Sequence, residues 1–287
     1  MLTIFSIPKP FTGVDDHHQR NAVNSWKQLV GGENVLLIGD DSIESPAKDL
    51  AVRYATGVKS NEYGTPLISS AFEIAREHSK TPYLAYSNCD MILFEELMHG
   101  LKKIISCPDF DSFLATTRRI NLPVDGLVDF GDREAVEELK LSAQEHGEIE
   151  SLVCKDVMIF PRDLYDSIPD FVVGRGNWDN WMVYQAKQIG AAVIRMQADI
   201  PTVHQAHSYD KFGAAQRRGC YVTSAEARSN QRLAGGRHLI VGSTCDYFLD
   251  CNGMRLSRFK WAQSEFWRDF PRFAGLLWQL TGVSRGN

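Results

Sequence analysis

Residues 82–90 have the sequence PYLAYSNCD, which predicts a strand followed by a polar turn. The run PYLAY is short, apolar and bounded by polar residues, which predicts a buried strand. The strand passes directly into a polar turn that ends in Asp90. A carboxylate fixed at the end of a buried strand can hold Mg²⁺ or Mn²⁺ and so neutralise a diphosphate. An aspartate that caps the following helix has the same spacing, so both interpretations stay open.

Outward from this stretch, short apolar runs alternate with segments whose apolar residues have helical spacing. In the first half, the predicted strands are residues 2–7, 35–38, 82–86 and 112–117, and the predicted helices are residues 15–30, 47–54, 65–75 and 94–105. Strands that alternate with helices of this length predict βαβ units. We therefore expect an α/β fold with a mainly parallel central sheet and helices on both faces.

The second half of the chain has a less regular pattern. Strands are predicted at residues 156–160 and 192–196, and a helix is predicted to begin near Trp178. Neither an internal repeat nor a low-complexity linker divides the sequence. We therefore expect one domain over residues 1–250, followed by a C-terminal helical extension over residues 251–287.

Ligands of parallel sheets bind beyond the carboxyl ends of the strands. The polar segments that follow the first three predicted strands are residues 8–13, 39–41 and 88–90. These segments are expected to share one edge of the sheet. At that edge Asp40 and Asp41 could bond a nucleobase or a ribose, although Gly39-Asp40-Asp41 is equally typical of a turn.

The composition and the absent motifs exclude several classes of protein. Of the 287 residues, 44% are hydrophobic and 23% are charged, as in ordinary soluble globular proteins. The 31 basic and 36 acidic residues give a net charge of −5, which disfavours nucleic acid as a partner. Six cysteines without a CxxC pair and an N-terminus without a basic segment predict a cytoplasmic protein with reduced thiols. No GxxxxGK[ST] loop, complete GxGxxG fingerprint or HExxH helix occurs.

His204 and His207 follow the last predicted strand, three residues apart. Imidazole is a good ligand for transition metals, and two such histidines can join one site. Together with Asp90 they would form a mixed oxygen and nitrogen site that suits Mn²⁺. Histidines with this spacing are more commonly surface or core residues.

Residues 174–181, GRGNWDNW, are the least ordinary stretch of the sequence. Tryptophan rings stack on sugar faces or bases, while the side chains of Asp179 and Asn180 can bond hydroxyl groups. Two tryptophans beside a glycine loop favour a binding surface over simple packing. The carboxylate of Asp179 also fits the N-terminal turn of a helix, where it complements the helix dipole.

In their order along the chain, these motifs resemble the GT-A type of nucleotide-diphospho-sugar glycosyltransferase, and specifically a group of family-2-like glycosyltransferases. The matching segments span most of residues 3–230: TIFSIPKPF (3–11), QRNAVNSW (19–26), VLLIGDD (35–41), NEYGTPLI (61–68), YSNCDMIL (86–93), DVMIFPRDLY (156–165), FVVGRGNWDNW (171–181), TVHQAH (202–207) and SAEARSN (224–230). The resemblance implies a GT-A-like, Rossmann-type α/β sandwich. The GRGNWDNW block is fairly specific, and each other segment is weak alone.

The resemblance also implies roles for individual residues. The donor would contact Pro8, Asp40, Asp41, Asn88 and Asp90. Asp90, with His204 or His207, would hold Mn²⁺ or Mg²⁺ against the diphosphate. The first acid of the family's DxD-like motif is replaced here by Asn88. On the acceptor side, Asp179 would be the general base, and the expected substrate contacts are Arg175, Trp178, Asn180, Trp181 and Asp156.

The implied activity is transfer of a sugar from a UDP- or GDP-sugar to a hydroxyl of a glycan or another acceptor. Inversion is expected because the sequence offers a single plausible base. A non-catalytic nucleotide- or glycan-binding module is a second possibility, which Asn88 favours. A sugar-nucleotide nucleotidyltransferase is a third, but its Gly-rich, Arg-containing loop after the first strand is replaced here by PKPFTG at residues 8–13.

Aromatic and aliphatic residues recur over residues 261–283, which predicts an amphipathic helical segment interrupted at Pro271. Packing on the domain or on a subunit partner is the ordinary explanation for such a segment. Peripheral contact with the inner face of a membrane is the alternative, because Arg268 and Arg272 lie beside the aromatic residues.

Overall fold

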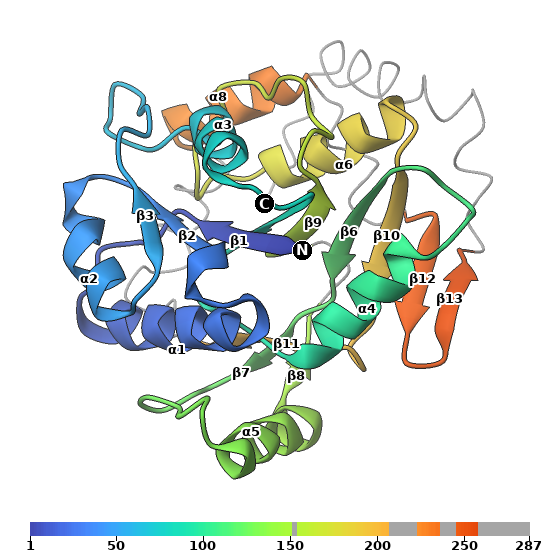
Figure 1. The fold of residues 1–287 in the computed structure, drawn as a ribbon. Helices are drawn as coiled ribbons and strands as arrows, with labels where there is room; N and C mark the ends of the chain where they lie inside the picture. Colours follow the sequence, from blue (N-terminus) through green and yellow to red (C-terminus); the bar gives the residue numbers. More distant parts are fainter. Residues whose placement is uncertain (151–153, 207–222, 236–244, 258–287) are drawn as a thin grey trace.

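The structure is a computed structural model that describes residues 1–150, 154–206, 223–235 and 245–257. Its centre is a nine-stranded sheet in the order β13-β12-β10-β6-β9-β4-β1-β2-β3 (Figure 1). The strands are β1 (Leu2–Ser6), β2 (Val35–Ile38), β3 (Arg53–Ala55), β4 (Tyr83–Ser87), β6 (Phe113–Thr117), β9 (Val157–Pro161), β10 (Ala192–Met196), β12 (Tyr247–Asp250) and β13 (Gly253–Leu256).

The pairing within this sheet is mainly parallel, as expected. β1 pairs in parallel with β2 and β4, and β10 pairs in parallel with β6 and β12. β9 lies between β4 and β6 and is antiparallel to both, and β13 is antiparallel to β12. The inversion of β9 brings its first residue to the edge of the sheet where the parallel strands end.

Helices cover both faces of the sheet because successive residues of each strand point to opposite sides. Ile4 packs in one hydrophobic cluster with residues of α1 (Gly13–Val30), α2 (Glu44–Asp49) and α4 (Glu95–Ile105). Phe5, the next residue, packs in the other cluster with residues of α3 (Ile68–His78), α6 (Trp178–Gln188) and α8 (Ala225–Ala234). Figure 1 shows the first set below the sheet and the second set above it. The α/β sandwich expected from the sequence is therefore confirmed.

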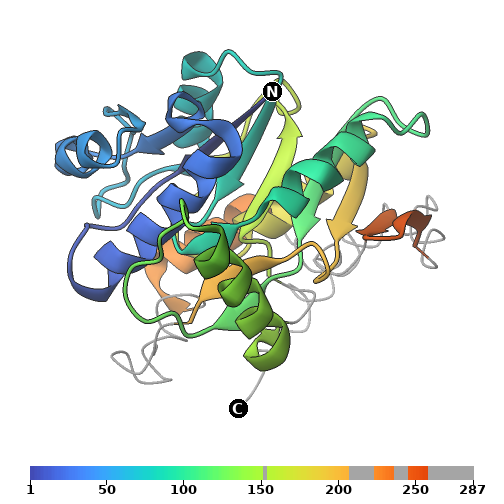
Figure 2. The ribbon, with the colours of Figure 1, turned by 60° about the horizontal axis from the view of Figure 1, so that its bottom comes forward.

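A second, four-stranded sheet lies below the first, in the order β5-β11-β7-β8. Its strands are β5 (Met91–Leu93), β7 (Ile120–Leu122), β8 (Glu148–Ile149) and β11 (Thr202–Gln205). Helix α5 (Arg133–His146) covers it and contributes Ala143 to a small hydrophobic cluster with Ile120 and Val203. Figure 2 shows α5 in front of this sheet. None of these five elements was predicted. The four strands have only two to four residues and carry too little periodicity. Helix α5 buries only Lys140 and Ala143, so its sequence has little of the apolar spacing that marks a helix.

Two further boundaries differ from expectation. The prediction of a helix over residues 47–54 is wrong for its second half. Helix α2 ends at Asp49, and Ala51 has a positive φ of 52°. Tyr54 lies in β3, opposite Leu37 of β2. The first part of the expected C-terminal extension forms β13 of the main sheet. The amphipathic segment at 261–283 lies outside the described residues.

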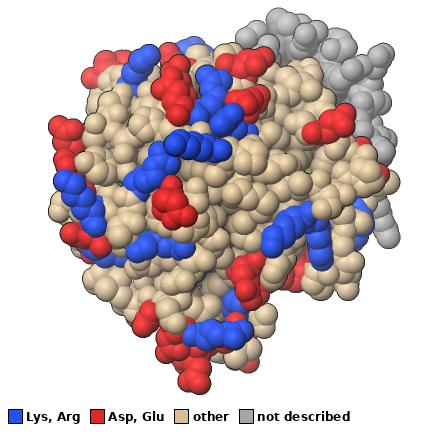
Figure 3. Space-filling view, viewed as in Figure 1, with Lys and Arg blue, Asp and Glu red and all other residues tan. Residues whose placement is uncertain are grey.

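The described surface carries both signs of charge. On the face in Figure 3, Lys and Arg side chains are interspersed with Asp and Glu side chains. Within the described ranges, no helix combines the length and the apolar character needed to span a membrane.

Candidate active site

The segments expected to share one edge of the sheet do so. Ser6 of β1 is opposite Leu37 of β2, and Phe5 is opposite Tyr86 of β4, so these parallel strands end side by side. Pro8 therefore lies at this edge between the Asn88–Asp90 turn on one side and the Gly39–Asp41 turn on the other. Asp156 joins them because it precedes the antiparallel strand β9, whose Val157 is opposite Ser87.

The small sheet brings His204 to Asp90. Met91, which follows Asp90, is opposite His204 in the β5–β11 pair, and His204 is opposite Asn121 in the β11–β7 pair. The carbonyl oxygen of Asp90 also accepts hydrogen bonds from the backbone and the side-chain amides of Gln205, each at 3.2 Å. The turn that carries Asp90 is thereby held to strand β11.

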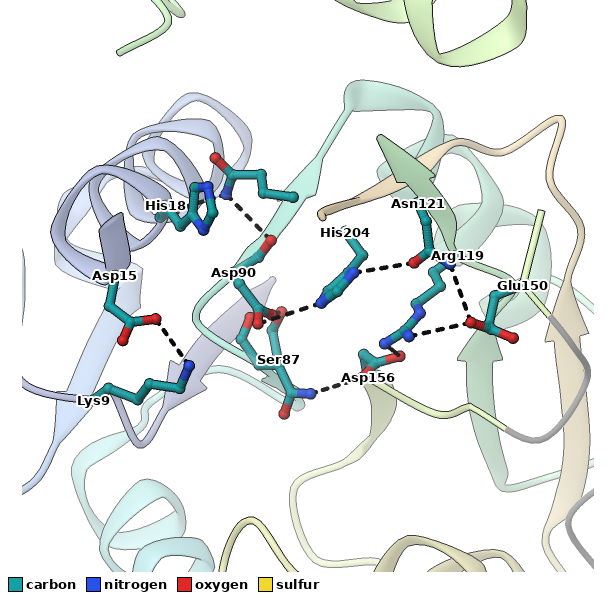
Figure 4. A network of polar contacts seen from close by, with 12 residues as sticks. Lys9, Asp15, His18, Ser87, Asp90, Arg119, Asn121, Glu150, Asp156 and His204 are labelled. Atoms are coloured by element: carbon teal, nitrogen blue, oxygen red, sulfur yellow. Dashed lines mark hydrogen bonds and ion pairs between the residues drawn. The ribbon is translucent and has the colours of Figure 1, made fainter. Parts of the chain in front are cut away.

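A continuous set of polar contacts connects the two ends of this turn (Figure 4). We call its members the polar network: Asn88, Asp90, Arg119, Asn121, Glu150, Asp156 and His204. The side-chain amide of Asn88 donates to Oδ1 of Asp156 at 2.7 Å, and Arg119 Nη1 lies 2.9 Å from the other oxygen, Oδ2. Arg119 Nη2 reaches Oε2 of Glu150 at 3.3 Å.

The second half of the polar network leads from Glu150 to Asp90. Nδ2 of Asn121 donates to Oε2 of Glu150 at 3.1 Å, and Oδ1 of Asn121 lies 3.0 Å from Nδ1 of His204. The other ring nitrogen of His204, Nε2, lies 3.5 Å from Oδ2 of Asp90. The imidazole is almost fully buried, with 4% of its side chain exposed.

Negative charge accumulates at this edge of the sheet. Burial raises the pKa of the Asp156 carboxyl, Arg119 opposes that effect, and Asp90 adds to it. Burial also raises the pKa of Tyr86, and the carboxylates of Asp156, Asp90 and Asp179 raise it further. The carboxylates of Asp90, Asp156 and Asp179 thus lie around one phenol, and Arg119 and Lys155 lie beside two of them.

Asp90 and His204 fit a divalent cation by their chemistry, since a carboxylate and a neutral imidazole are both ligands of Mn²⁺. The Asp90 carboxylate, in the turn that precedes β5, faces the imidazole of His204 in the neighbouring strand β11. Within the described ranges, no set of three or more His, Cys, Asp or Glu side chains is grouped for metal binding. His207, the third expected ligand, lies outside those ranges.

Asp179 and Asn180 lie in the first turn of α6, next to Lys155. The Lys155 side chain is fully buried, and its Nζ lies 2.5 Å from Oδ1 of Asn180 and 3.5 Å from Oδ2 of Asp179. Desolvation lowers the pKa of the Lys155 ammonium, and the nearby Asp179 carboxylate opposes that effect. About a quarter of the Asp179 side chain, 24%, is exposed. Asn180, an expected substrate contact, is thus engaged by a buried lysine.

The two tryptophans of the GRGNWDNW block lie in the core. Trp178 is 7% exposed and packs edge-on against Tyr86, with ring centroids 5.1 Å apart, and against Phe72. Trp181 is 5% exposed and packs against Phe171. The structure therefore corrects the expectation of an open platform for sugar stacking. The three-residue spacing of the tryptophans on α6, with Met182 beside the second, was the sequence signal for a buried helix face.

Arg175, also expected to contact substrate, forms an ion pair with Glu226 of α8 at 2.5 Å. Glu226 accepts a second bond from Asn61 at 2.7 Å. Asn230, one helical turn further along α8, donates to the carbonyl oxygens of Val172 and Gly176 and accepts from the Val172 amide. Three motifs that are far apart in the sequence therefore hold the glycine loop in front of α6.

The expected nucleotide side of the edge is more open. The side chain of Gln19 accepts from the backbone amide of Lys9 at 2.7 Å and donates to its carbonyl at 3.1 Å, which fixes the loop that contains Pro8. Asp40 caps a short 3₁₀ turn by accepting from the Ser42 hydroxyl and amide, and these bonds lower the pKa of its carboxyl. Asp40 and Asp41 are both exposed.

Sequence reasoning missed Arg119, Asn121, Glu150 and Lys155. Arg119 is the second residue after the run 112–117, so the rule that ligands gather at strand ends would have found it. Asn121 lies in the three-residue strand β7, and Glu150 directly follows the two-residue strand β8. Strands this short show no periodicity in the sequence. Lys155 precedes Asp156 and is placed at this edge only because β9 is antiparallel.

No family model and no curated protein matches this chain. Among solved structures, it is similar to the mannosyltransferase PcManGT from Pyrobaculum calidifontis, in complex with GDP-Man and Mn²⁺, with a TM-score of 0.51 and 10% identity over 99% of this chain and 76% of that chain. It also matches the Mycobacterium tuberculosis glucosyl-3-phosphoglycerate synthase, with a TM-score of 0.48 and 13% identity over 82% of this chain and 79% of that chain. A third match is residues 1–349 of S. aureus TarS in complex with UDP-GlcNAc, with a TM-score of 0.48 and 10% identity over 84% of this chain and 67% of that chain. The chain therefore has the GT-A-type fold seen in nucleotide-sugar glycosyltransferases.

Proposed function

We propose that the protein is a metal-assisted glycosyltransferase that moves a sugar from a UDP- or GDP-sugar to an acceptor hydroxyl. The observation that carries this proposal is the approach of Asp90 and His204 to 3.5 Å, at the edge of a GT-A-type fold where the parallel strands end. Asp90 lies in the turn between β4 and β5, and His204 lies in β11, the strand that pairs with β5. The similar mannosyltransferase was solved with GDP-Man and Mn²⁺, which supports a donor and a cation of this class.

Asp90 and His204 would hold Mn²⁺ or Mg²⁺. When bound, the cation neutralises the diphosphate that leaves as the glycosidic bond breaks. The loop fixed by Gln19, which contains Pro8, and the exposed Asp40 and Asp41 are the groups available to the nucleotide on the same edge.

Asp179 is the general base in this proposal. Its carboxylate is partly exposed and lies 3.5 Å from Nζ of the buried Lys155, which orients it. Asp156 is less suited to this role, because its two oxygens already contact Asn88 and Arg119. Removal of the acceptor proton by one base opposite the leaving group gives inversion of the anomeric centre.

A non-catalytic nucleotide- or glycan-binding module is the alternative that Asn88 favours in the sequence. In the structure the side-chain amide of Asn88 has a structural role, because it donates a hydrogen bond to the buried carboxylate of Asp156. The replacement of the first motif acid is therefore compatible with a working cation site.

The first test removes the metal ligand. Purified Asp90→Ala should lose Mn²⁺-dependent binding of UDP and GDP in calorimetry, with an almost unchanged melting temperature. Asp111→Ala is the matched control, since the exposed Asp111 precedes β6 and lies at the opposite edge of the sheet. Equal nucleotide affinity of Asp90→Ala and the unsubstituted protein, with and without Mn²⁺, would remove the metal role.

The second test removes the base. Asp179→Asn keeps the shape of the side chain and should lower sugar transfer by about 10²–10⁴-fold, while donor binding is retained. Transfer is measured with a panel of sugar nucleotides, and metal-dependent donor hydrolysis serves where no acceptor is known. If Asp179→Asn keeps full activity and Asp156→Asn does not, the base is Asp156. Metal-independent nucleotide binding without hydrolysis of any donor would identify a non-catalytic module.

A further inference from the structure

We propose that Asn121 and Glu150 are positioning residues that fix the tautomer of His204, so that its Nε2 presents a lone pair toward Asp90 and a cation can be held between them. The inference rests on the proposed metal site and adds two residues that support one of its ligands. Neither residue would contact the cation or the substrate.

The argument starts at Glu150, whose carboxylate defines the direction of the Asn121 amide. An ionised carboxylate only accepts hydrogen bonds. Oε2 of Glu150 lies 3.1 Å from Nδ2 of Asn121, and Arg119 Nη2 lies 3.3 Å from the same oxygen. The NH₂ group of Asn121 must therefore face Glu150, and its carbonyl oxygen must face His204.

The direction of the amide then determines the histidine. Oδ1 of Asn121 lies 3.0 Å from Nδ1 of His204, and an amide oxygen can only accept. Nδ1 therefore carries the hydrogen. In the neutral ring the other nitrogen, Nε2, has a lone pair, and the tautomer is set by the bond that the partner nitrogen makes.

A third contact joins His204 to Asp90. Nε2 of His204 lies 3.5 Å from Oδ2 of Asp90, and in the neutral form both atoms present lone pairs. Such a pair is unfavourable unless a positive charge lies between the atoms. Asn121 and Glu150 therefore orient His204 so that a cation can bind between Nε2 and Asp90, as hydrogen bonds from outside the ligand set orient the histidines of metal sites.

The strand register keeps this arrangement in place. Asn121 is directly opposite His204 across the parallel β7–β11 pair, and Asn121 is opposite Glu148 across the β7–β8 pair, two residues from Glu150. The His204 side chain is buried, so rotation of the ring would need displacement of its neighbours. The four-stranded sheet thus carries the ligand and both of its positioning residues.

The test replaces Asn121 in the full-length chain and measures the ring directly. Asn121→Leu removes both polar groups at similar size, Asn121→Asp keeps the acceptor for His204, and Asn252→Leu on the exposed β12–β13 turn is the matched control. The tautomer is read from the ¹⁵N chemical shifts of labelled histidine, with His204→Gln for assignment. Mn²⁺ affinity is measured by calorimetry and by the electron paramagnetic resonance signal of unbound Mn²⁺.

In the unsubstituted protein without metal, Nδ1 of His204 is expected to carry the hydrogen. Asn121→Leu should lose this preference and bind Mn²⁺ about 10–100-fold more weakly, whereas Asn121→Asp should keep the Nδ1–H tautomer. A hydrogen on Nε2 in the neutral unsubstituted protein, or Mn²⁺ affinity of Asn121→Leu within twofold of it, overturns the inference. Failure of the proposed metal site is recognised separately, because Asp90→Ala would then bind Mn²⁺ normally.

Discussion

Two regions of the molecule meet at the candidate site, and they are built in different ways. The polar network is held by hydrogen bonds and ion pairs between residues that lie in strands or in the segments next to strands. The stretch 174–181 is held by two buried tryptophans and by contacts of its glycine loop with α8. Rare residue types therefore mark packing in this protein, while ordinary polar residues at strand ends form the candidate chemistry.

Asp179 is the exception in the second region. It lies between the two buried tryptophans in sequence, and its carboxylate is partly exposed beside Lys155. The core packing of its neighbours determines where the first turn of α6 begins. Substitutions of the buried tryptophans should therefore first reduce stability, whereas substitutions of the proposed metal ligands Asp90 and His204 should first change ligand binding.

The largest effect is expected for Trp178→Ala. Removal of a ring that packs against Tyr86 and Phe72 should lower the free energy of unfolding by about 3–5 kcal/mol. Urea denaturation followed by circular dichroism measures this loss. Trp178→Phe keeps an aromatic ring in the core and should retain most of the stability. If Trp178→Ala keeps its native stability but loses sugar binding, Trp178 has the stacking role expected from the sequence instead.

An intermediate effect is expected for Asn88→Asp, which restores the acid of the DxD-like motif. The new carboxylate would replace the amide that lies 2.7 Å from Oδ1 of the buried Asp156. The loss of the hydrogen bond and the repulsion between like charges should reduce the free energy of unfolding by about 1–3 kcal/mol. Mn²⁺ affinity, measured by calorimetry, should not increase. Asn88→Ala loses the hydrogen bond without adding a charge, so it separates the two contributions to the loss of stability. If Asn88→Asp is as stable as the unsubstituted protein and binds Mn²⁺ more tightly, Asn88 is only the remnant of a metal ligand.

The smallest effect is expected for Glu226→Gln, and it depends on pH. Desolvation raises the pKa of Glu226, but bonds from Thr65, Asn61 and Arg175 together hold it below the ordinary value of 4.5. The ionised form therefore contributes stability that is complete above this value and is lost as the pH falls through the lowered pKa. The difference in unfolding free energy between the two proteins should be roughly 1 kcal/mol at neutral pH and should shrink in acid. If the difference in unfolding free energy does not change with pH, the stabilisation comes from packing rather than from the charge of Glu226. Glu62→Gln, at an exposed position, is the control.

Much of the main sheet follows from the sequence, because β1, β2, β4 and β6 are runs of wholly or mainly buried residues separated by amphipathic helices. The shared edge of Pro8, Asp40 and Asp90 follows from the same pattern. The direction of β9 does not, since a buried apolar run has the same pattern in either orientation. The approach of His204 to Asp90 depends on the pairing of strands of three and four residues that are distant in sequence. Such pairing is decided by tertiary contacts, which local periodicity does not contain.

The position of β9 also has a consequence for the order in which the chain is completed during synthesis. β1, β2, β3 and β4 are neighbours in the sheet and can pair once residue 87 has been made. β6 is made next, but its two neighbours, β9 and β10, come later in the chain. A growing chain therefore exposes the hydrogen-bonding edge of β4 and an unpaired β6 until β9 is inserted between them, a state that favours aggregation or the recruitment of chaperones. The edge that carries the candidate site is finished only when the ribosome has passed residue 204.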